Sequence, residues 1–594
     1  MIDIEKEILK KFPTLDSKSQ MIKKSLFKIA KKVIHEDKIN KFLDSHGHLD
    51  GFEFVEAVLE FLNFDFSYSN SELINIPSSG RVVIISNHPL GALDALSLLK
   101  LISMVRRDVK IVANDFLAGF ESLNSLFIKI DNFKSKQNKA NIQKVYNSLN
   151  SEEALIIFPA GEVSRATPKG IRDGEWQKGF LKFASRTHSP ILPILVDAKN
   201  SKRFYTLSIL NKTFSTILLS DEMFKKQDKE IYLKIGKIIP YENIEPKSID
   251  TNHIVNLYKK HLYALKKPNR EYFKTQTPIA HPENRQELKR DLKSSTLLGE
   301  TKDGKKIYLY HYKADSIVLK ELGRLREVSF RKVQEGINEK RDRDKYDKYY
   351  EHIVLWDEDD LEIVGSYRVG NSQNIIDKYG EDSLYTTTLF EFKDEFRPYL
   401  KNSIELGRSF VQPKYWGSRA LDYLWFGIGA YLRDNPKIKY MFGPVSLSAS
   451  YPLDAKNLIT YFYNQYFGTT ETLVEAKIPF IPKCEEFSHN FKWDDYRDDF
   501  KSLKSMLSGF GVSVPTLYKQ YSELTKEGGI KFCAFNIDPN FSDCIDGFIV
   551  VDIKKIKDDK KRRYIQCSSG VVQGSGDANA TIVQGSGDAN ATII

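Results

Sequence analysis

Short apolar runs alternate with helical stretches from Arg81 to about Pro240, and this alternation limits the fold of the chain more than any other feature. The runs are RVVIIS, VKIVAN, ALIIFP, PILPILVDA and IYLKIGKIIP. Because they have little polar content, they predict buried strands covered by helices on both faces of a sheet. The sequence therefore predicts an α/β domain whose chemistry belongs in loops at the strand ends.

A second α/β domain is expected after a polar segment with two prolines, KTQTPIAHPENRQELKRDLKSSTLLGETKDGKK, because such segments join domains. The runs HIVLWD, IVGSYRV, SIELGRSFV and GFIVVDI predict its strands, and SRALDYLWFGIGAYLRD its clearest helix. At the end, VQGSGDANATI occurs twice. We expect a first domain over 1–275 with a helical lead-in over 1–70, a linker over 276–305, a second domain over 306–555 and a flexible tail over 556–594.

Charge and cysteine content limit the partners. The net charge of +10 favours an acidic partner, such as nucleic acid, an anionic membrane surface or an acidic carrier protein. No array of interleaved aromatic and basic residues supports nucleic acid. The four cysteines have no metal-type spacing, so we expect reduced thiols, a cytoplasmic location and no bound metal or cofactor.

Membrane contact is expected to be peripheral. The N-terminus does not have the pattern of a secretory signal, and no apolar stretch reaches the roughly 18–20 uninterrupted residues of a membrane span. The lead-in SQMIKKSLFKIAKKVIHEDKINKFLDSH has apolar residues three and four apart with lysines between them. This pattern fits an amphipathic helix on the core, and it also fits a basic helix at a membrane surface.

The first candidate site is the run VVIISNHPLGALDALSLLK. Its strand ends at His88, and Asp94 begins the next helix. A histidine oriented by a carboxylate suits a general base, because the carboxylate fixes the tautomer and stabilises the imidazolium. The same pattern also fits a surface histidine beside an aspartate that caps a helix.

A second motif, ALIIFPAGEVSR, repeats the strand-and-turn construction. The two motifs and the later SPILPILV resemble the glycerolipid acyltransferase family typified by lysophosphatidic acid acyltransferase. The resemblance implies that His88 is the base, that Asp94 orients it, and that a substrate hydroxyl attacks an acyl carbon. It also implies that the residues around the acceptor are Asn87, Glu162, Ser164 and Arg165.

The motifs depart from that family in three ways. Five residues instead of four separate His88 from Asp94, so the Pro-Leu-Gly turn must loop out for the same pairing. Ala160 holds the usual place of the glutamate, which comes two residues later. Asp131 and Asn132 stand where the family often has Ile-Asp-Arg, which weakens the case for a phosphate on the acceptor. These changes resemble the hemolysin-like branch, whose acceptor is a lyso-aminolipid.

The second candidate site is a series of acids and arginines near predicted strand ends. As isolated charges they are equally well explained as solvated ion pairs. Their order resembles the acyl-homoserine lactone synthases and the ornithine N-acyltransferases, which share an acetyltransferase-like (GNAT-type) fold. The resemblance implies that the acids hold an amino acid's ammonium group and receive its proton, with Glu405 and Asp347 catalytic. The series is Arg326, Asp342, Asp344, Asp347, Arg368, Glu405 and Arg408.

The acyl donor is inferred from the segment KYWGSRA. It keeps Gly417 of the usual coenzyme A pyrophosphate loop and has Arg419 where a small residue belongs, which favours an acyl carrier protein over acyl-CoA. The basic run Lys340, Arg341, Arg343 and Lys345 fits either an acidic carrier helix or a solvated helix face.

The joined domains resemble the bifunctional ornithine lipid synthases. The resemblance implies that the second domain transfers a 3-hydroxyacyl group to the amine of ornithine, or alternatively glycine, and that the first domain acylates the 3-hydroxyl. A fused, basic enzyme at the inner face of the cytoplasmic membrane would suit such products. Two alternatives remain: a lysophospholipid acyltransferase whose second domain only binds carrier protein or lipid, and a non-enzymatic binder of membranes or nucleic acid.

Overall fold

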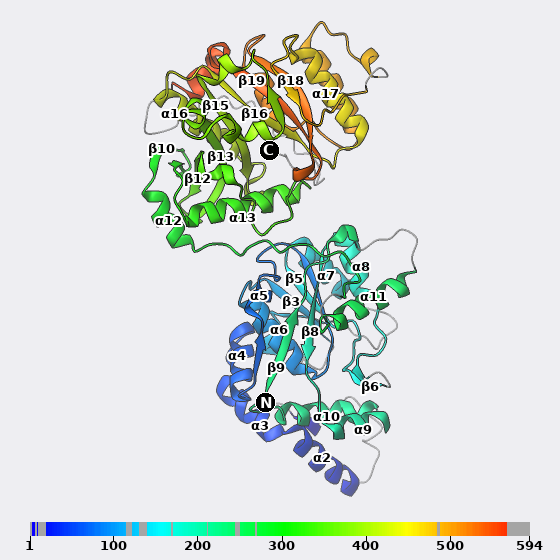
Figure 1. Ribbon diagram of the computed structural model, residues 1–594. Helices are drawn as coiled ribbons and strands as arrows, with labels where there is room; N and C mark the ends of the chain where they lie inside the picture. Colours follow the sequence, from blue (N-terminus) through cyan, green and yellow to red (C-terminus); the bar gives the residue numbers. More distant parts are fainter. Residues whose placement is uncertain are drawn as a thin grey trace. The chain divides into compact units, whose positions relative to one another are not determined.

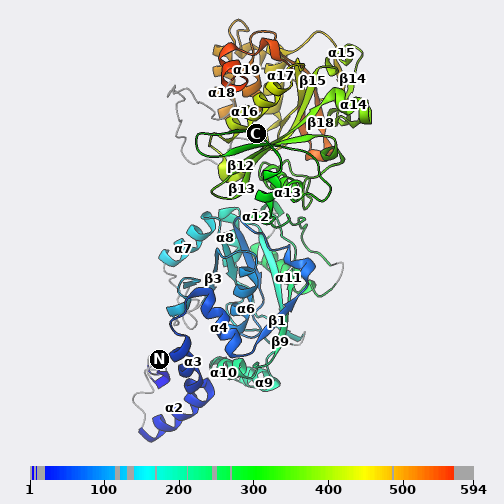
Figure 2. The ribbon, with the colours of Figure 1, turned by 90° about the vertical axis from the view of Figure 1, so that its left-hand side faces the viewer.

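The computed structural model describes residues 3–5, 9, 20–113, 121–129, 139–167, 170–210, 212–243, 250–267, 270–483 and 487–566. The chain divides into two compact units, Met1–His281 and Pro282–Ile594 (Figures 1 and 2). Each unit combines a large sheet with covering helices, so the predicted α/β class is confirmed. No helix in the described part of the chain has both the length and the hydropathy of a membrane span.

Seven strands form the main sheet in the described part of the first unit, in the order β1-β9-β8-β2-β5-β3-β4. All neighbours are parallel except β8 and β9. A short hairpin of β6 and β7 stands apart. The strands are β1 (Asp65–Tyr68), β2 (Val82–Ser86), β3 (Val109–Ala113), β4 (Phe127–Lys129), β5 (Ala154–Ile157), β6 (Arg165–Thr167), β7 (Gly170–Arg172), β8 (Ile191–Asp197) and β9 (Glu230–Ile235).

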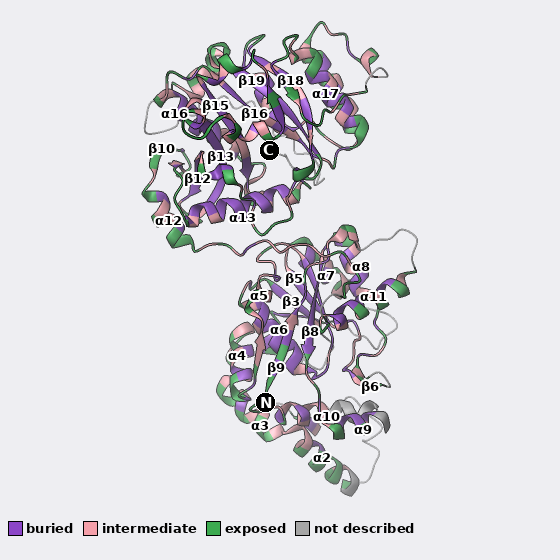
Figure 3. Ribbon diagram, in the orientation of Figure 1, coloured by how far each residue is buried: buried purple, intermediate pink, exposed green. Residues whose placement is uncertain are grey.

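Helices cover both faces of this sheet. Val82 and Ile84 of β2 join the core beneath α4 and α6, whereas Val83 and Ile85 join the core beneath α7, α8 and α11. With neither face solvated, the central strands β2 and β5 are apolar and buried along their length, and Figure 3 shows the burial of the central strands. The helices are α2 (Gln20–Ile34), α3 (Glu36–His46), α4 (Gly51–Phe61), α5 (Asn70–Leu73), α6 (Ala92–Ser103), α7 (Lys139–Asn150), α8 (Gly179–Thr187), α9 (Lys202–Leu210), α10 (Lys212–Phe224) and α11 (Thr251–Ala264).

Eight strands form the main sheet in the described part of the second unit, in the order β10-β11-β12-β13-β15-β16-β19-β18. The strands are β10 (Thr296–Glu300), β11 (Lys306–Tyr310), β12 (Glu351–Asp357), β13 (Glu362–Asn371), β15 (Ser403–Val411), β16 (Tyr440–Leu447), β18 (Ile530–Asp538) and β19 (Cys544–Asp552), with β14 (Phe390–Phe392) and β17 (Val474–Ala476) in a separate pair. The helices are α12 (Arg285–Lys293), α13 (Ile317–Lys332), α14 (Ser372–Tyr379), α15 (Arg397–Leu400), α16 (Ala420–Asp434), α17 (Leu453–Phe467), α18 (Tyr496–Gly509), α19 (Thr516–Leu524) and α20 (Asp558–Tyr564).

The parallel pair β15 and β16 opens along its length. The two strands are in register only from Ser403 to Glu405 of β15. Beyond that point β15 pairs with β13, and β16 pairs with β19. A small cavity lined in part by Leu406, Gly443 and Tyr521 borders the opening. Glu405 is the last residue of β15 that is in register with β16.

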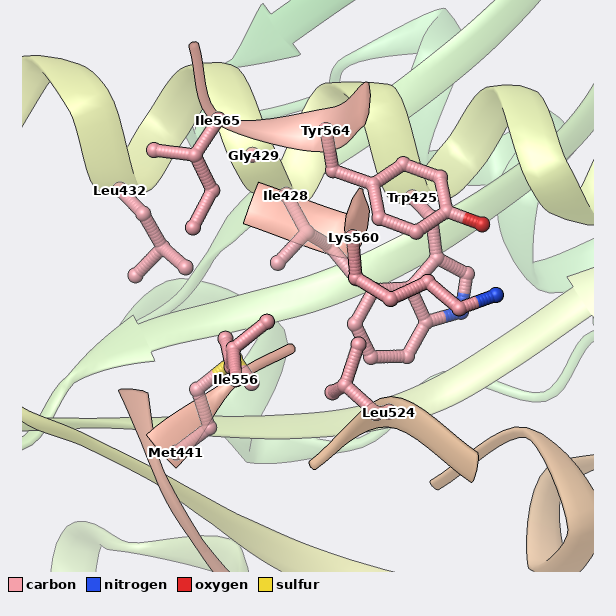
Figure 4. A pocket seen from close by; sticks show the side chains of 10 residues that line it. All are labelled: Trp425, Ile428, Gly429, Leu432, Met441, Leu524, Ile556, Lys560, Tyr564 and Ile565. Carbon is pink, nitrogen blue, oxygen red and sulfur yellow. The ribbon is translucent and has the colours of Figure 1, made fainter. Parts of the chain in front are cut away.

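Three expected boundaries need correction. The range 276–305 contains α12 and also β10, whose backbone pairs with β11 and so belongs to the second sheet. The range 556–594 begins with α20, which packs closely on α16: a Cβ on Gly429 would lie 1.9 Å from the Tyr564 carbonyl oxygen (Figure 4). Within 1–70, β1 pairs with β9 and is a strand. The tandem repeats lie outside the described residues.

Candidate active sites

The first site lies where β2 ends and α6 begins. His88 follows the strand, and its Nδ1 is 3.1 Å from Oδ2 of Asp94, the third residue of the helix. The same oxygen accepts hydrogen bonds from the backbone N–H groups of Leu90 (2.8 Å) and Gly91 (3.1 Å). Gly91 has φ 85°, in the region that favours glycine, so the turn accommodates its extra residue while His88 and Asp94 meet.

Burial governs the chemistry of this pair. Asp94 is fully buried, and burial raises its pKa, although His88 and the two backbone N–H groups oppose the rise. The imidazole is 16% exposed and stacks on Phe158, with ring centroids 4.0 Å apart. With Nδ1 facing the carboxylate, Nε2 is the atom left to take a proton. This is the arrangement that a general base requires.

Asp173 fixes the loops around His88. Its Oδ1 accepts hydrogen bonds from Ser164 Oγ (2.5 Å) and from the His88 backbone N–H (3.2 Å), and its Oδ2 accepts from Trp176 Nε1 (2.9 Å). The Ser164 backbone N–H also donates to the His88 carbonyl (2.7 Å). Asp173 therefore joins the second motif to the first, and no pattern in the sequence pointed to it.

Two residues predicted to bind substrate are engaged inside the protein. Asn87 Nδ2 donates to the Val196 carbonyl (2.9 Å), and its Oδ1 accepts from the Val196 N–H (2.8 Å), so it ties β2 to β8. Ser164 is buried and bonded to Asp173. Their side-chain hydrogen bonds are thus made to the protein itself, beside His88.

The other predicted residues of this site are more open. Arg165 Nε lies 3.5 Å from Glu162 Oε2, and the Glu162 side chain is 37% exposed. Their segment runs beside His88 through the Ser164 backbone contact. Asp131 and Asn132 lie outside the described residues.

The second site is a buried network of arginines and aspartates. Arg326 of α13 donates from Nη1 to Asp347 Oδ1 (2.9 Å). Arg368 of β13 donates from Nη1 to both oxygens of Asp344 (2.7 and 2.8 Å) and to Asp347 Oδ1 (3.3 Å). The arginines come from a helix and a strand, and both acids come from one loop. Charged residues of the predicted series that are far apart in the sequence are thus joined in one network.

Arg408 of β15 extends the network. It donates from Nη1 to Asp342 Oδ2 (3.1 Å), and its Nε lies 3.6 Å from Asp344 Oδ2. Its backbone has φ 46°, a strained conformation for a side chain other than glycine. The guanidinium groups of Arg408 and Arg368 lie 5.1 and 5.0 Å from the ring centroid of Tyr385, in cation–π range.

The acids of the network differ in protonation and access. Burial alone would raise the pKa of Asp347, but Arg326 and Arg368 hold it well below its ordinary value. Burial raises the pKa of Asp342 in spite of Arg408. The side chain of Asp344 is 20% exposed and that of Arg408 11%, whereas Asp347 is 3% exposed. The network is therefore open at Asp344 and Arg408.

Glu405 lies beside the network with both oxygens occupied. Oε1 accepts from the Thr386 backbone N–H (2.7 Å) and hydroxyl (2.5 Å), and Oε2 accepts from the Tyr350 hydroxyl. Burial raises the pKa of Glu405. Arg368 lies 5.0 Å from the Tyr350 ring centroid, so Tyr350 links Glu405 to the arginines.

Comparisons with known proteins match both halves of the chain. An acyltransferase family model matches residues 10–269, and an acetyltransferase (GNAT) domain model matches residues 325–426. The glycine N(alpha)-acyltransferase of Phocaeicola vulgatus is 31% identical over 303 residues, covering 48% of this chain and 92% of that protein. The lyso-glycine lipid O-acyltransferase of the same organism is 31% identical over 252 residues, covering 41% and 88%. The L-ornithine N(alpha)-acyltransferase of Brucella abortus is 32% identical over 244 residues, covering 40% and 78%.

This chain belongs to the aminolipid acyltransferases. It joins in one chain two acyltransferase domains that match two different proteins of Phocaeicola vulgatus. The predicted family, enzyme class and place in aminolipid synthesis are confirmed. The alternative of a lysophospholipid acyltransferase with a non-catalytic second domain is not favoured, because the chain also matches proteins named as N-acyltransferases.

Sequence patterns missed several polar residues of the aminolipid acyltransferase. Besides Tyr350 and Thr386, His352 lies inside the network, with Nδ1 3.2 Å from Arg326 Nη2. Burial lowers the pKa of His352 to about 3, so the ring is neutral and accepts from the arginine. Its one sequence signal is a histidine opening an otherwise apolar strand.

A buried carboxyl pair on the same unit was also missed. Asp546 Oδ1 accepts from Ser446 Oγ (2.6 Å), across the β16–β19 register. Burial raises the pKa of Asp546 to about 7 and that of Glu335 to about 8. Each sits in an apolar run or a turn, where pattern gives no sign of a buried acid.

Proposed function

We propose that this enzyme makes a diacylated aminolipid in two steps that run against the chain order. The second domain transfers a 3-hydroxyacyl group from an acyl carrier protein to the amine of an amino acid, and the first domain acylates the 3-hydroxyl of the resulting lyso-lipid. The observation that carries the proposal is the presence of two acyl-transfer sites in one chain: a His–Asp pair 3.1 Å apart and a separate arginine–aspartate network.

In the first domain, His88 is the proposed base. Its Nε2 takes the proton of the 3-hydroxyl while that oxygen bonds to the thioester carbonyl carbon. The C–S bond then breaks, and the imidazolium returns the proton to the leaving thiolate. Asp94, at 3.1 Å from Nδ1, stabilises the imidazolium between these events. Glu162 and Arg165 are proposed to contact the acceptor, in keeping with their greater exposure.

In the second domain, the open end of the network suits a zwitterionic amino acid. Asp344 is proposed to hold the ammonium group, and Arg408 the carboxylate. One ammonium proton must leave before the nitrogen attacks the thioester, and we assign its acceptance to Glu405 through the Tyr350 hydroxyl. The second proton leaves as the amide forms and goes to the thiolate. Asp347, with its lowered pKa, holds Arg326 and Arg368 in place and takes no proton.

Glycine is the proposed amino acid, and ornithine is the second candidate. Two different proteins, one named for glycine and one for lyso-glycine lipid, match 48% and 41% of this chain, whereas a protein named for ornithine matches 40%. This order reverses the preference drawn from motif resemblance.

Two partners are proposed from exposed charge. Lys340, Arg343 and Lys345 are exposed beside the network and suit an acidic carrier protein. Helix α2 exposes Leu26 and Ile29 among lysines, a pattern that suits peripheral binding at the inner face of the cytoplasmic membrane.

The test is expression in a host that lacks aminolipids, fed with labelled glycine or labelled ornithine and followed by lipid mass spectrometry. The proposal predicts a diacylated lipid that carries the glycine label. Incorporation of the ornithine label would select the second candidate. New phosphatidic acid without any amide-linked lipid would contradict the proposal.

A further inference from the structure

An exposed apolar loop of the second unit, residues 477–483 with the sequence KIPFIPK, has no role in either site. Ile481 is 77% exposed and Ile478 45%. Leu453, in the first turn of α17, is 63% exposed. Single exposed apolar side chains are common on protein surfaces, but a group of them marks an interaction surface.

The loop is held firmly in this exposed position. Backbone N–H groups of Phe480 and Ile478 donate to the Phe535 carbonyl (2.9 Å) and to Asn536 Oδ1 (2.7 Å). At the other end, the Lys483 N–H donates to Asn457 Oδ1 (3.2 Å), one helical turn from Leu453. Pro479 and Pro482 restrict the backbone further. The loop therefore presents Ile481 in a preformed shape, so little conformational entropy is lost on binding.

The charges around the loop select the kind of surface. Lys477 and Lys483 are exposed at its two ends, and Lys456 is half-buried on α17. Acids lie nearby as well: Asp454 is in the same helical turn as Leu453, and Glu475, two residues before Lys477, is paired with Lys393 (2.7 Å). Apolar side chains beside lysines suit the interface of an anionic bilayer, where the apolar side chains enter the acyl region and an exposed lysine such as Lys483 reaches the head groups. A projecting tip inserts, whereas docking to a carrier helix calls for a groove.

The loop is also connected to the wall of the N-acyltransferase site. The Lys477 N–H donates to the Leu389 carbonyl (3.0 Å), and its Nζ donates to the Thr387 carbonyl (2.5 Å). Thr387 follows Thr386, which binds Glu405, and Tyr385, which contacts Arg368 and Arg408. The loop is thus bonded, through Lys477, to the segment Tyr385–Leu389 that contacts the site, and an acyl product formed there would lie close to the loop.

We propose that residues 477–483 insert into an anionic bilayer and anchor the N-acyltransferase domain where its lipid product enters the membrane. The inference rests on the proposed function only for the identity of that product. Insertion itself follows from the exposed isoleucines and the flanking lysines.

The test is binding of the full-length chain to vesicles of phosphatidylglycerol or of phosphatidylcholine, measured by co-sedimentation. Ile481→Asp is expected to weaken binding to phosphatidylglycerol about tenfold, because it removes the apolar side chain that would enter the bilayer and adds a charge of the same sign as the lipid. Leu297→Asp, at a side chain 52% exposed on β10, is the matched control and is expected to change binding less than about twofold. Ile481→Trp should add fluorescence that brominated lipids quench. The fluorescence that Leu297→Trp adds should not be quenched.

The outcomes separate the inference from the proposed function. Wild-type binding by Ile481→Asp, or unquenched fluorescence from Ile481→Trp, would overturn the inference. If Ile481→Asp raises the KM for acyl carrier protein in the absence of vesicles and leaves vesicle binding unchanged, the inference is also overturned and the loop is assigned to the carrier protein. If no variant forms an amide, the proposed function fails, while the vesicle comparison still decides whether the loop inserts.

Discussion

The two sites of this enzyme handle charge in opposite ways. The first relies on one partly exposed histidine whose carboxylate partner is held by two neutral backbone N–H groups. The second gathers three arginines and three aspartates, most of them buried. The difference follows the acceptors: a hydroxyl is neutral and needs only a base, whereas an amino acid is zwitterionic and needs complementary charges. The two sites should therefore fail differently when one group is removed.

The largest effect is expected for Arg368→Met. It leaves Asp344 without its bidentate partner and Asp347 with one arginine, and an uncompensated buried charge costs roughly 3–5 kcal/mol. We expect a large drop in the free energy of unfolding of the second unit and no amide product, measured by denaturant titration and lipid analysis. Arg397→Met removes an exposed pair with Asp394 and should change stability by less than about 0.5 kcal/mol. Equal effects from the two variants would contradict the network.

In the first site, Asp94→Asn is expected to reduce turnover more than stability. The substitution keeps the size of the side chain but removes the charge that favours the imidazolium, so O-acylation should fall on the order of 10²–10⁴-fold. Amide formation should stay unchanged. The measurement is the ratio of lyso-lipid to diacyl lipid, with Asp197→Asn at an exposed ion pair as the control. A matching loss of amide formation would indicate general damage to the fold.

Tyr350→Phe sharpens the comparison within the second site. It removes the donor to Glu405 Oε2 and leaves a buried carboxylate oxygen unsatisfied, at about 1–3 kcal/mol. If Tyr350 relays the proton, amide formation should fall and its pH profile should change, while O-acylation persists. Tyr312→Phe, at an exposed tyrosine, is the control. An unchanged pH profile would assign Tyr350 a structural role only.

The smallest effect is expected for Asp546→Asn, and it depends on pH. Burial raises the pKa of Asp546 to about 7 from 3.8, so the folded chain binds this proton more tightly than the unfolded chain. Stability from this group is thus present at low pH and is lost as pH rises from about 4 to 7. Asp546→Asn should therefore be more stable than wild type at pH 8 and close to it in stability at pH 4. If Asp546→Asn and the wild type have the same thermal unfolding temperature at pH 8 as well as at pH 4, this assignment is contradicted.

The fold was predictable because the strands of both sheets are short apolar runs in the sequence. Apolar runs such as Val82–Ser86 are buried on both faces, and the predicted helix SRALDYLWFGIGAYLRD contains α16. Boundaries were less predictable: β10 has exposed positions and reads as linker, and α20 is a charged helix held through Gly429. These elements depend on a partner from elsewhere in the chain, which local pattern does not contain.

The site residues also differ in how far local sequence pattern predicts them. His88 follows a strand and Asp94 lies in the first turn of a helix, which made this pair visible in the sequence. The acids and arginines of the second site were visible through their charge and order, although Arg326, Arg368 and Arg408 lie within a helix and two strands. Asp173, Tyr350 and Thr386 act through contacts with residues far away in the chain. Asn87 and Ser164 hydrogen-bond to Val196 and to Asp173 inside the protein, which residue type alone did not indicate.

The central claim is that the two sites act in series, with the amide formed first. Lipid mass spectrometry of a host without aminolipids that expresses His88→Ala tests it most directly. The account predicts that the mono-acylated amide accumulates and the diacyl lipid disappears, because the second domain still works and the first lacks its base. A diacyl lipid at the wild-type level from His88→Ala would contradict the account.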